Sequence, residues 1–302
     1  MCHRILASLS SLLGSLAFLC ALPSWAEIRV VDGIGREVVL ERPAASIISL
    51  APHNTENLFT AGAGEKVVGV VNHSDYPPAA RQIPLIGTHV QFNLELIVSM
   101  KPDLIVAWQS GNAEEVLRRL EELGFPIYVS QPFTIDDIVG SIENLARLAG
   151  TQDAVDPELG PAVRKLEELR RDHAHKRPVE VFYQVWTEPL ITLNGRHILS
   201  QALGICGAKN IFGQLPMLAP RISIESVLDI NPEAIVTDLV DGRVPDMSYW
   251  ENWSSIRAVQ RQNYVFLDPD VMFRPTLRML KGIPDFCAEL DLIRTRQESP
   301  QS

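Results

Sequence analysis

One motif occurs twice in this chain, first as NLELIVSMKPDLIV over Asn93–Val106 and again as SIESVLDINPEAIV over Ser223–Val236. The glutamate, the proline and the closing Ile-Val are identical in the two copies. Each copy predicts a short helix that begins at an Asn or Ser cap, ends before the proline and leads into a buried strand. Two copies so far apart favour two similar α/β lobes over a solenoid of short repeats, and the cleft between two lobes is a common ligand site.

Predicted strands and helices alternate along most of the chain, which indicates parallel sheets. The run Pro157–Lys176 differs, because it has a narrow apolar stripe among charges and no partner strand. A helix of about 20 residues would be about 30 Å long. We interpret it as a stiff connector between the lobes, with an ordinary surface helix of one lobe as the alternative. The predicted fold class is α/β, with two Rossmann-like lobes of parallel sheet over 27–152 and 178–296, a backbone helix over 153–177, a ligand cleft between the lobes and a tail over 297–302.

The N-terminus has the pattern of a secretory signal peptide. Arg4 supplies a positive start, residues 12–22 are mostly apolar, and Ser24–Ala26 is a small-x-small cleavage site. We therefore expect cleavage after Ala26 and a periplasmic protein. A buried N-terminal helix is the alternative. Cys20 raises the further alternative of a lipoprotein, although a lipobox needs a small residue before the cysteine.

The composition and the motifs argue against several classes of function. Acidic residues outnumber basic ones by 37 to 27, and the net charge of −10 argues against nucleic acid as a partner. The chain has no GxSxG, HExxH or CxxC motif and no glycine-rich phosphate loop, so we expect no catalytic residues and no cofactor. The histidines are scattered singly, so we expect no metal site. We interpret His173 and His175 as solvated.

Two of the four cysteines, Cys2 and Cys20, fall within the predicted signal peptide, which leaves Cys206 and Cys287. A single remaining pair in an oxidising compartment favours a disulfide, with two buried free thiols as the alternative.

Aromatic side chains follow four of the predicted strands or lie at their ends, namely Tyr76, Trp108, Trp186 and Phe273. In open α/β sheets, ligands bind outside the carboxyl ends of the strands. Four aromatic rings at such ends suit a large, flat and partly apolar ligand. The alternative is that each ring packs within its own lobe.

The repeated glutamates, Glu95 and Glu225, also have two interpretations. Each is near the start of its helix, where a carboxylate is stabilised by the positive end of the helix dipole. Alternatively, the two carboxylates mark equivalent points on the two lobes that a symmetric membrane partner could recognise.

Several segments together resemble one family. They are Ser49–Glu56 (SLAPHNTE), Ser74–Pro78 (SDYPP), Asn93–Glu95, Lys101–Trp108 (KPDLIVAW) and Cys206–Phe212 (CGAKNIF). From about Ala45 to Leu290 the chain is similar to the cobalamin-binding members of the Fe/B12 periplasmic-binding family, which deliver ligands to ABC importers. The Asp-Tyr-Pro-Pro turn and the Ala-Trp strand end are the more specific signals. The Lys-Pro-Asp segment is shared with haem and ferric-siderophore receptors.

The resemblance implies two α/β lobes joined by one long helix, with the ligand in the cleft. It implies that Tyr76 and Trp108 line this cleft and that the loop of Pro52, His53 and Asn54 lies beneath the corrin. We also expect the chain to act as a monomer.

The resemblance also assigns roles outside the cleft. It implies that Glu95 and Glu225 meet basic residues of the membrane permease. It further implies that the disulfide of this family lies in the second lobe, between Cys206 and Cys287.

The chain departs from the family pattern in three places. It has His89 where an aromatic residue is expected, Met217 and Arg221 in a loop where a tryptophan is expected, and Trp186 in place of a small residue. We expect the ligand-binding set to comprise Pro52, His53, Asn54, Tyr76, His89, Trp108, Trp186, Arg221, Phe273 and Arg274.

We therefore expect a periplasmic solute-binding protein that captures cobalamin or a related corrinoid and delivers it to an ABC importer. Binding of haem or a ferric siderophore is the alternative within the family, since His53, His73, His89 or Tyr76 could supply an axial iron ligand. An exported metal-dependent hydrolase is a further alternative, but it would require convergent histidine and carboxylate ligands.

Overall fold

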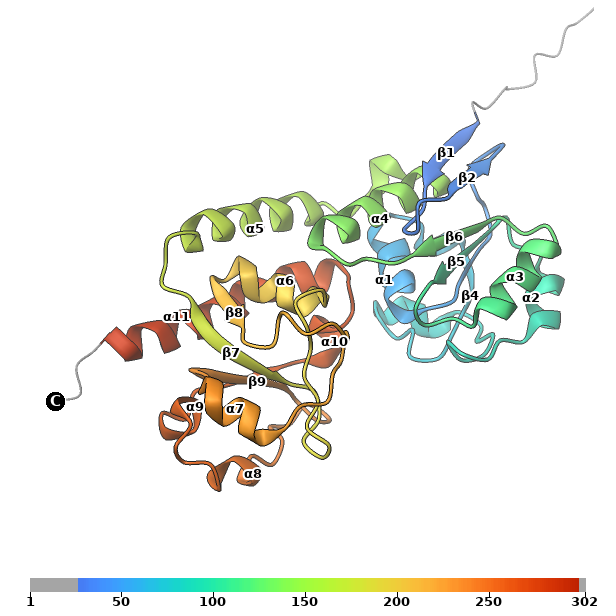
Figure 1. Cartoon of the computed structure of the whole chain (residues 1–302). Helices are drawn as coiled ribbons and strands as arrows, with labels where there is room; N and C mark the ends of the chain where they lie inside the picture. Colours follow the sequence, from blue (N-terminus) through green and yellow to red (C-terminus); the bar gives the residue numbers. More distant parts are fainter. Residues whose placement is uncertain (1–26, 299–302) are drawn as a thin grey trace, which may run out of the picture.

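The computed structural model describes residues 27–298, which form two α/β lobes beside a long helix (Figure 1). The predicted signal peptide, residues 1–26, lies outside the described residues, as do positions 299–302. Among the residues described, no helix is both long enough and apolar enough to cross a membrane.

Lobe one is built on a parallel sheet of four strands in the order β4-β3-β5-β6. The strands are β3 (Ile47–Ser49), β4 (Val67–Val70), β5 (Leu104–Trp108) and β6 (Ile127–Ser130). The helices are α1 (Pro52–Thr60), α2 (Leu94–Met100), α3 (Glu114–Glu122) and α4 (Ile135–Ala149), with short 3₁₀ turns at Gly64–Lys66, Pro78–Gln82 and Gln152–Ala154. Successive residues of β5 pack into different cores, because side chains alternate between the faces of a strand.

Lobe two repeats this architecture with a parallel sheet in the order β10-β9-β7-β8. The strands are β7 (Val179–Gln184), β8 (Ala208–Asn210), β9 (Ala234–Asp238) and β10 (Tyr264–Leu267). The helices are α6 (Ile198–Ile205), α7 (Ile224–Ile230), α8 (Ser248–Glu251), α9 (Arg257–Gln260), α10 (Pro269–Met272) and α11 (Leu277–Glu298). Numbered within each lobe, both sheets have the order 2-1-3-4, so the two lobes share one topology.

The repeated motif occupies the same place in each lobe. In both copies the cap residue accepts a hydrogen bond from the backbone of its helix, Asn93 from Leu96 N–H and Ser223 from Ser226 N–H. Each helix ends at a left-handed residue directly before the proline, with φ of 47° at Lys101 and 56° at Asn231. The strand that follows is the third of its sheet in both lobes. The sequence pattern predicts a strand at this point in each copy, but β8, which precedes the second one, was not predicted.

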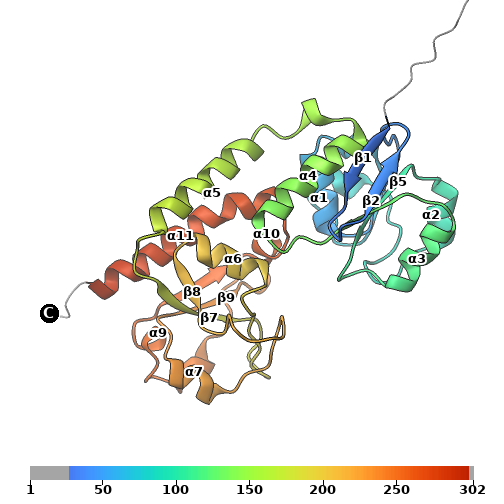
Figure 2. The ribbon, with the colours of Figure 1, turned by 45° about the horizontal axis from the view of Figure 1, so that its top comes forward.

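The connecting helix α5 (Leu159–His173) begins later and ends earlier than the predicted helix over Pro157–Lys176. Its 15 residues span about 22 Å. It lies beside α11 (Figure 2), and its buried stripe joins a hydrophobic core that includes residues of both lobes. The helix is therefore a connector that also packs on lobe two.

Three features differ from the expectations or settle an open alternative. An antiparallel hairpin of β1 (Ile28–Val31) and β2 (Glu37–Leu40) precedes lobe one and was not predicted. The prediction that His173 is solvated was wrong: this side chain is buried and contacts the Leu169 carbonyl and the Asp291 carboxylate. The disulfide between Cys206 and Cys287 is present, so the free-thiol alternative does not hold.

Candidate functional site

The carboxyl ends of the first and third strands face the switch point of each sheet, where ligands of open α/β folds bind. In lobe one, β3 leads through Ala51 into α1, and β5 ends at Trp108. In lobe two, β7 leads to Trp186, and β9 ends at Asp238. Each lobe thus places an aromatic side chain beside its switch point, Trp108 at the end of the third strand of lobe one and Trp186 after the first strand of lobe two.

The strand ends of lobe one form a buried, polar floor. His53, 5% exposed, meets Trp108 edge to face with 5.2 Å between ring centroids. Asn54 is fully buried and donates to the Ala107 carbonyl at 3.0 Å. Pro52 starts α1, and its missing N–H costs no hydrogen bond there. The structure therefore brings the predicted residues Pro52, His53, Asn54 and Trp108 together.

The floor holds two buried polar atoms that have no hydrogen-bond partner among the described residues, Nε2 of His53 and Oδ1 of Asn54. Burial, together with the charge of Arg274, lowers the pKa of His53 to about 3. The imidazole is therefore neutral at physiological pH. Trp108 is held on its other side by Gly111, where a Cβ would lie only 1.8 Å from the indole.

Arg274 and four neighbours form a group of charges that we name the inter-lobe ion cluster, composed of Glu56, Asp75, Asp270, Arg274 and Arg278. Arg274 of lobe two donates to the carboxylates of Glu56 and Asp75 in lobe one, both at 3.0 Å. Arg278 of α11 makes a bidentate contact with Glu56, at 2.8 and 2.5 Å. The cluster ties α1 and the Tyr76 turn to the start of α11.

Tyr76 lies at the edge of this cluster and is 42% exposed. The guanidinium carbon of Arg278 lies 4.0 Å from the centre of its ring. A cavity of about 280 Å³ between the lobes is lined by Tyr76, by Glu56 and Thr60 of α1, and by residues of α11. The predicted residues Tyr76 and Arg274 are thus next to each other at the lobe junction.

The strand ends of lobe two are more open. Trp186 is 61% exposed, and its indole N–H donates to the Glu188 carbonyl at 2.9 Å. Together with Asp238 and Tyr249 it lines a cavity of about 480 Å³. Tyr183 donates a 2.6 Å hydrogen bond to Asp238, but burial is the larger effect and raises the pKa of Asp238 to about 6.

Three predicted residues lie apart from these groups. His89 is half-buried, and its carbonyl accepts from Asn112 at 2.8 Å. Arg221 is exposed and forms a β-bridge with Ile191. Phe273 packs its ring against two aromatic residues of its own lobe, Tyr183 at 6.1 Å and His197 at 5.9 Å. The ring of Phe273 therefore packs within lobe two, as the alternative for the aromatic residues expected.

Glu95 and Glu225 are exposed, each at the start of its short helix. The burial pattern is the same over 91–97 and 221–227, so the two carboxylates have equivalent settings. Hydrogen bonds from its own backbone N–H and from the Ser223 side chain lower the pKa of Glu225. Helices α2 and α7 lie far from α5, toward the outer ends of their lobes (Figure 1).

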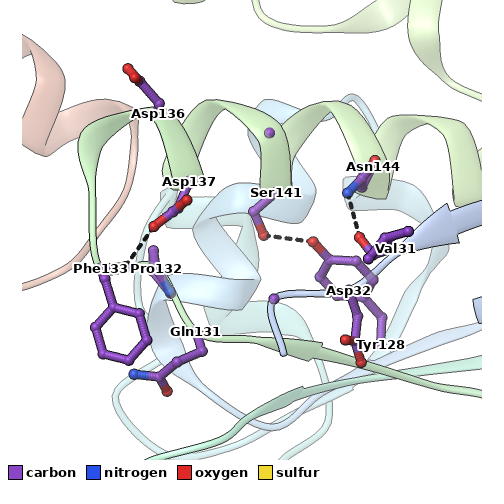
Figure 3. Close-up of a pocket in the computed structure, with 12 residues that line it drawn as sticks. Val31, Asp32, Tyr128, Gln131, Pro132, Phe133, Asp136, Asp137, Ser141 and Asn144 are labelled. Atoms are coloured by element: carbon purple, nitrogen blue, oxygen red, sulfur yellow. Dashed lines mark hydrogen bonds between the residues drawn. The ribbon is translucent and has the colours of Figure 1, made fainter. Parts of the chain in front are cut away.

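A further cavity, of about 340 Å³, lies within lobe one beside α4 and the β1–β2 turn (Figure 3). Its carboxylates have structural roles. Asp32 accepts from the backbone of Ile34 and Arg36, and Asp137 accepts from the backbone of Phe133 and caps α4. This cavity is separate from the strand ends at the switch point. Across the residues described, no group of three or more His, Cys, Asp or Glu side chains is placed to hold a metal ion.

Sequence reasoning missed several residues of the site. Glu56 lies within a segment that carries the family resemblance, but no pattern assigned it a role. No sequence pattern indicated a role for Arg278, Tyr183 or Asp238. Their contacts are to residues far away in the sequence, and the burial of Asp238 arises only in the folded chain.

Two lobes of one topology, joined by a helix and linked by the inter-lobe ion cluster, are the architecture of a solute-binding protein. The chain matches the family model described as periplasmic binding protein over residues 47–271. It is 37% identical over 251 residues to a vitamin B12-binding protein of Vibrio cholerae, covering 83% of this chain and 90% of that protein. This chain belongs to the periplasmic binding protein family.

Solved structures agree with this assignment. The crystal structure of the periplasmic vitamin B12-binding protein BtuF of Vibrio cholerae matches with a TM-score of 0.74 at 37% identity, over 83% of this chain and 98% of that one. The periplasmic haem-binding protein HutB of Vibrio cholerae matches with a TM-score of 0.70 over 81% of this chain and 98% of that one. At 17% identity, the second likeness concerns the fold alone.

Proposed function

We propose that this protein binds cobalamin or a related corrinoid in the periplasm and delivers it to an ABC importer. The observation that carries the proposal is the 37% identity to a vitamin B12-binding protein over 83% of the chain. The aromatic side chains beside the switch points of both lobes support it, because a corrin ring is broad, flat and partly apolar.

The proposed site lies between the two switch points. Trp108 and Tyr76 contact the ligand from lobe one, above the floor of Pro52, His53 and Asn54, and Trp186 contacts it from lobe two. His89, Arg221, Phe273 and Arg274 complete the proposed ligand-binding set. The function is binding and release, with no catalytic residue, no resident cofactor and the corrinoid as transported cargo. A corrinoid whose own base fills the lower axial position needs no ligand from the protein.

Haem is the second candidate, and one observation favours it. His53 is neutral, and its Nε2 has no partner among the described residues, as an axial iron ligand would require before haem binds. A ferric siderophore is the other alternative ligand within the family.

Absorption spectra separate these candidates. The purified protein is equilibrated with cyanocobalamin, cobinamide or haemin, passed through a desalting column and measured. We expect cyanocobalamin to be retained with an unchanged cobalt coordination. Retention of haemin alone, with the spectrum of histidine-ligated iron that His53→Ala abolishes, would contradict the proposal and support the second candidate.

We further propose that Glu95 and Glu225 dock onto basic residues of the permease. Both are exposed in equivalent settings at the outer ends of the lobes. If the two carboxylates only stabilise their helices, reversal of both charges costs about 1–2 kcal/mol of stability in total and leaves transport intact.

The docking proposal predicts a different pattern for the double variant Glu95→Lys/Glu225→Lys. Corrinoid affinity stays near that of the wild type, whereas uptake into vesicles that carry the matched permease collapses, since like charges across an interface repel. A matched control is Glu114→Lys/Glu115→Lys, which reverses two carboxylates in the first turn of α3. Normal uptake by the first variant would rule the docking role out.

We also propose that the protein is exported by a signal peptide cleaved after Ala26 and acts as a monomer. The periplasmic family supports export. The mass of the protein recovered from the periplasm tests the cleavage site, and light scattering tests the monomer. Recovery with residues 1–26 intact would contradict the first point.

A further inference from the structure

Arg278 contacts the exposed aromatic residue of the Tyr76 turn from the opposite lobe. Its guanidinium carbon lies 4.0 Å from the centre of the Tyr76 ring, within the range of a cation–π contact. Such a contact requires the guanidinium to remain above the ring face. A neighbouring group must therefore fix the position of the Arg278 guanidinium.

The buried carboxylate of Glu56 holds the guanidinium in that position. The Glu56 side chain is 2% exposed and accepts from both Nε and Nη2 of Arg278, at 2.8 and 2.5 Å. A bidentate contact fixes the orientation of the planar guanidinium as well as its place. Glu56 is itself held by Arg274 at 3.0 Å, so the carboxylate has little freedom to turn.

The side chain of the residue before Tyr76 is bound by an arginine of the same cluster. Asp75 accepts from Arg274 at 3.0 Å, so two adjacent residues of the turn are each held by an arginine of lobe two. Tyr76 remains 42% exposed although it is held in this way. Its exposed ring surface is therefore available to a ligand in a restricted orientation.

We propose that Arg278 is a positioning residue for corrinoid binding: it acts through Tyr76 by holding the ring in place from the other lobe. The inference rests on the proposed function, in which Tyr76 contacts the ligand. A side chain that is ordered before binding loses less conformational freedom when the ligand arrives. Arg278 thus raises affinity without a contact of its own to the corrinoid.

A double-mutant cycle tests this role by titration with cyanocobalamin. Ordering one mobile side chain corresponds to about a 3- to 10-fold change in affinity, so Arg278→Met should weaken binding by that factor. In the Tyr76→Ala background the same substitution should change affinity less than about 2-fold, because the ring through which it acts is gone. Arg278→Lys, which keeps a cation able to pair with Glu56, should restore part of the loss.

Lys165→Met is the control. Lys165 is an exposed cation of α5 that pairs with Glu168, and it does not line the cavity of Tyr76, so its removal leaves the guanidinium–ring contact intact. It should leave affinity unchanged. Thermal unfolding of every variant identifies effects of stability alone, which would appear equally with and without the Tyr76 ring.

A ligand-free measurement separates this inference from the proposed function. The ring resonances of Tyr76, assigned in tyrosine-labelled protein by comparison with Tyr76→Phe, should shift in Arg278→Met and stay in place in Lys165→Met. Failure of the wild type to bind any corrinoid would contradict the proposed function, while the ring resonances would still decide the positioning role. Unchanged ring resonances in Arg278→Met, or an equal loss of affinity in both backgrounds of the cycle, would overturn the inference.

Discussion

Lobe one and lobe two have the same strand order, yet their first strands connect to the next helix in different ways. In lobe one β3 ends at Ser49 and α1 begins at Pro52, so the strand end is immediately covered by a helix. In lobe two β7 ends at Gln184 and α6 begins only at Ile198. The longer connection carries Trp186 out to 61% exposure, whereas His53 in lobe one is 5% exposed.

The difference shows that the shared topology determines where the site lies in each lobe. The length of the connection after the first strand determines how buried the side chains of the site are. The short connection of lobe one buries polar side chains, which then need fixed partners. The long connection of lobe two presents an exposed aromatic side chain and an open cavity. Lobe one is thus suited to form a rigid, buried surface of the site, and lobe two to form a more exposed surface that can adapt to the ligand.

The largest expected effect concerns the ion cluster that joins the lobes. Glu56→Gln should lower the free energy of unfolding by about 3–5 kcal/mol, because two largely buried arginines lose their shared carboxylate. Glu158→Gln, which removes an exposed partner of Lys281, should cost less than about 1 kcal/mol. Urea unfolding measures the free energy of unfolding of both variants. Equal decreases in the two variants would contradict the distinction between buried and exposed ion pairs.

The disulfide makes lobe two different in stability as well. Cys206 and Cys287 are 81 residues apart, so the bond closes a long loop. Its removal in Cys206→Ala/Cys287→Ala should cost about 2–5 kcal/mol. Thiol titration of the unfolded, unreduced wild type should find no free thiol at these positions. Hydrogen exchange should show the loss of protection in lobe two before lobe one, and a uniform loss would argue against separate contributions of the lobes.

Two tryptophans sharpen the comparison, Trp108 at the end of the third strand of lobe one and Trp186 after the first strand of lobe two. Trp108→Ala and Trp186→Ala should each weaken corrinoid binding by about 1–3 kcal/mol. Trp108→Ala should also lower stability, because the half-buried indole packs on His53 and Gly111. Trp186→Ala should change stability by less than about 0.5 kcal/mol, as expected for an exposed side chain. Titration and thermal unfolding of both variants measure the split.

The smallest expected effect is a pH dependence from lobe two. The pKa of Asp238 is about 6 in the folded protein, above its ordinary value, so the folded state holds the proton more tightly than the unfolded state. Asp238 therefore contributes stability that is present below about pH 4 and lost as pH rises through 6. With allowance for solvent screening, the loss is about 1–2 kcal/mol.

Urea unfolding of the wild type and of Asp238→Asn between pH 4 and pH 7 isolates this contribution. The difference between the two proteins should change over that interval and stay constant above it. His53 has the opposite sign, since its pKa of about 3 makes it destabilising as pH falls below 6.5. A constant difference between wild type and Asp238→Asn at all pH values would contradict the buried state of this carboxyl.

The repeated motif predicted the part of the fold that local sequence controls. Asn93 and Ser223 cap their helices, and each following proline prevents the helix from continuing, so helix and strand were readable in both lobes. The hairpin of β1 and β2 was not predicted, because strands of four residues give too short a pattern. Helix α5 was predicted too long because its charged ends carry no clear stop signal.

The site was predictable where it follows strands and not where it depends on distant pairs. Trp108 and Trp186 lie at strand ends that the alternating pattern locates. The partners of Glu56 are 218 and 222 residues away, and nothing local in the sequence indicates that an α1 carboxylate meets α11. Phe273 follows the last strand of lobe two as predicted, but only the folded chain shows its ring packed against Tyr183.

The central claim is that the strand ends beside the two switch points hold one corrinoid between Trp108 and Trp186. Calorimetric titration of the double variant Trp108→Ala/Trp186→Ala with cyanocobalamin tests it most directly. The account predicts that the wild type binds one cyanocobalamin per chain and that the double variant loses about the sum of the two single losses, roughly 2–6 kcal/mol in total, because the rings contact opposite sides of one ligand. Wild-type affinity in Trp186→Ala, with the whole loss found in Trp108→Ala, would place the ligand on lobe one alone and contradict the claim.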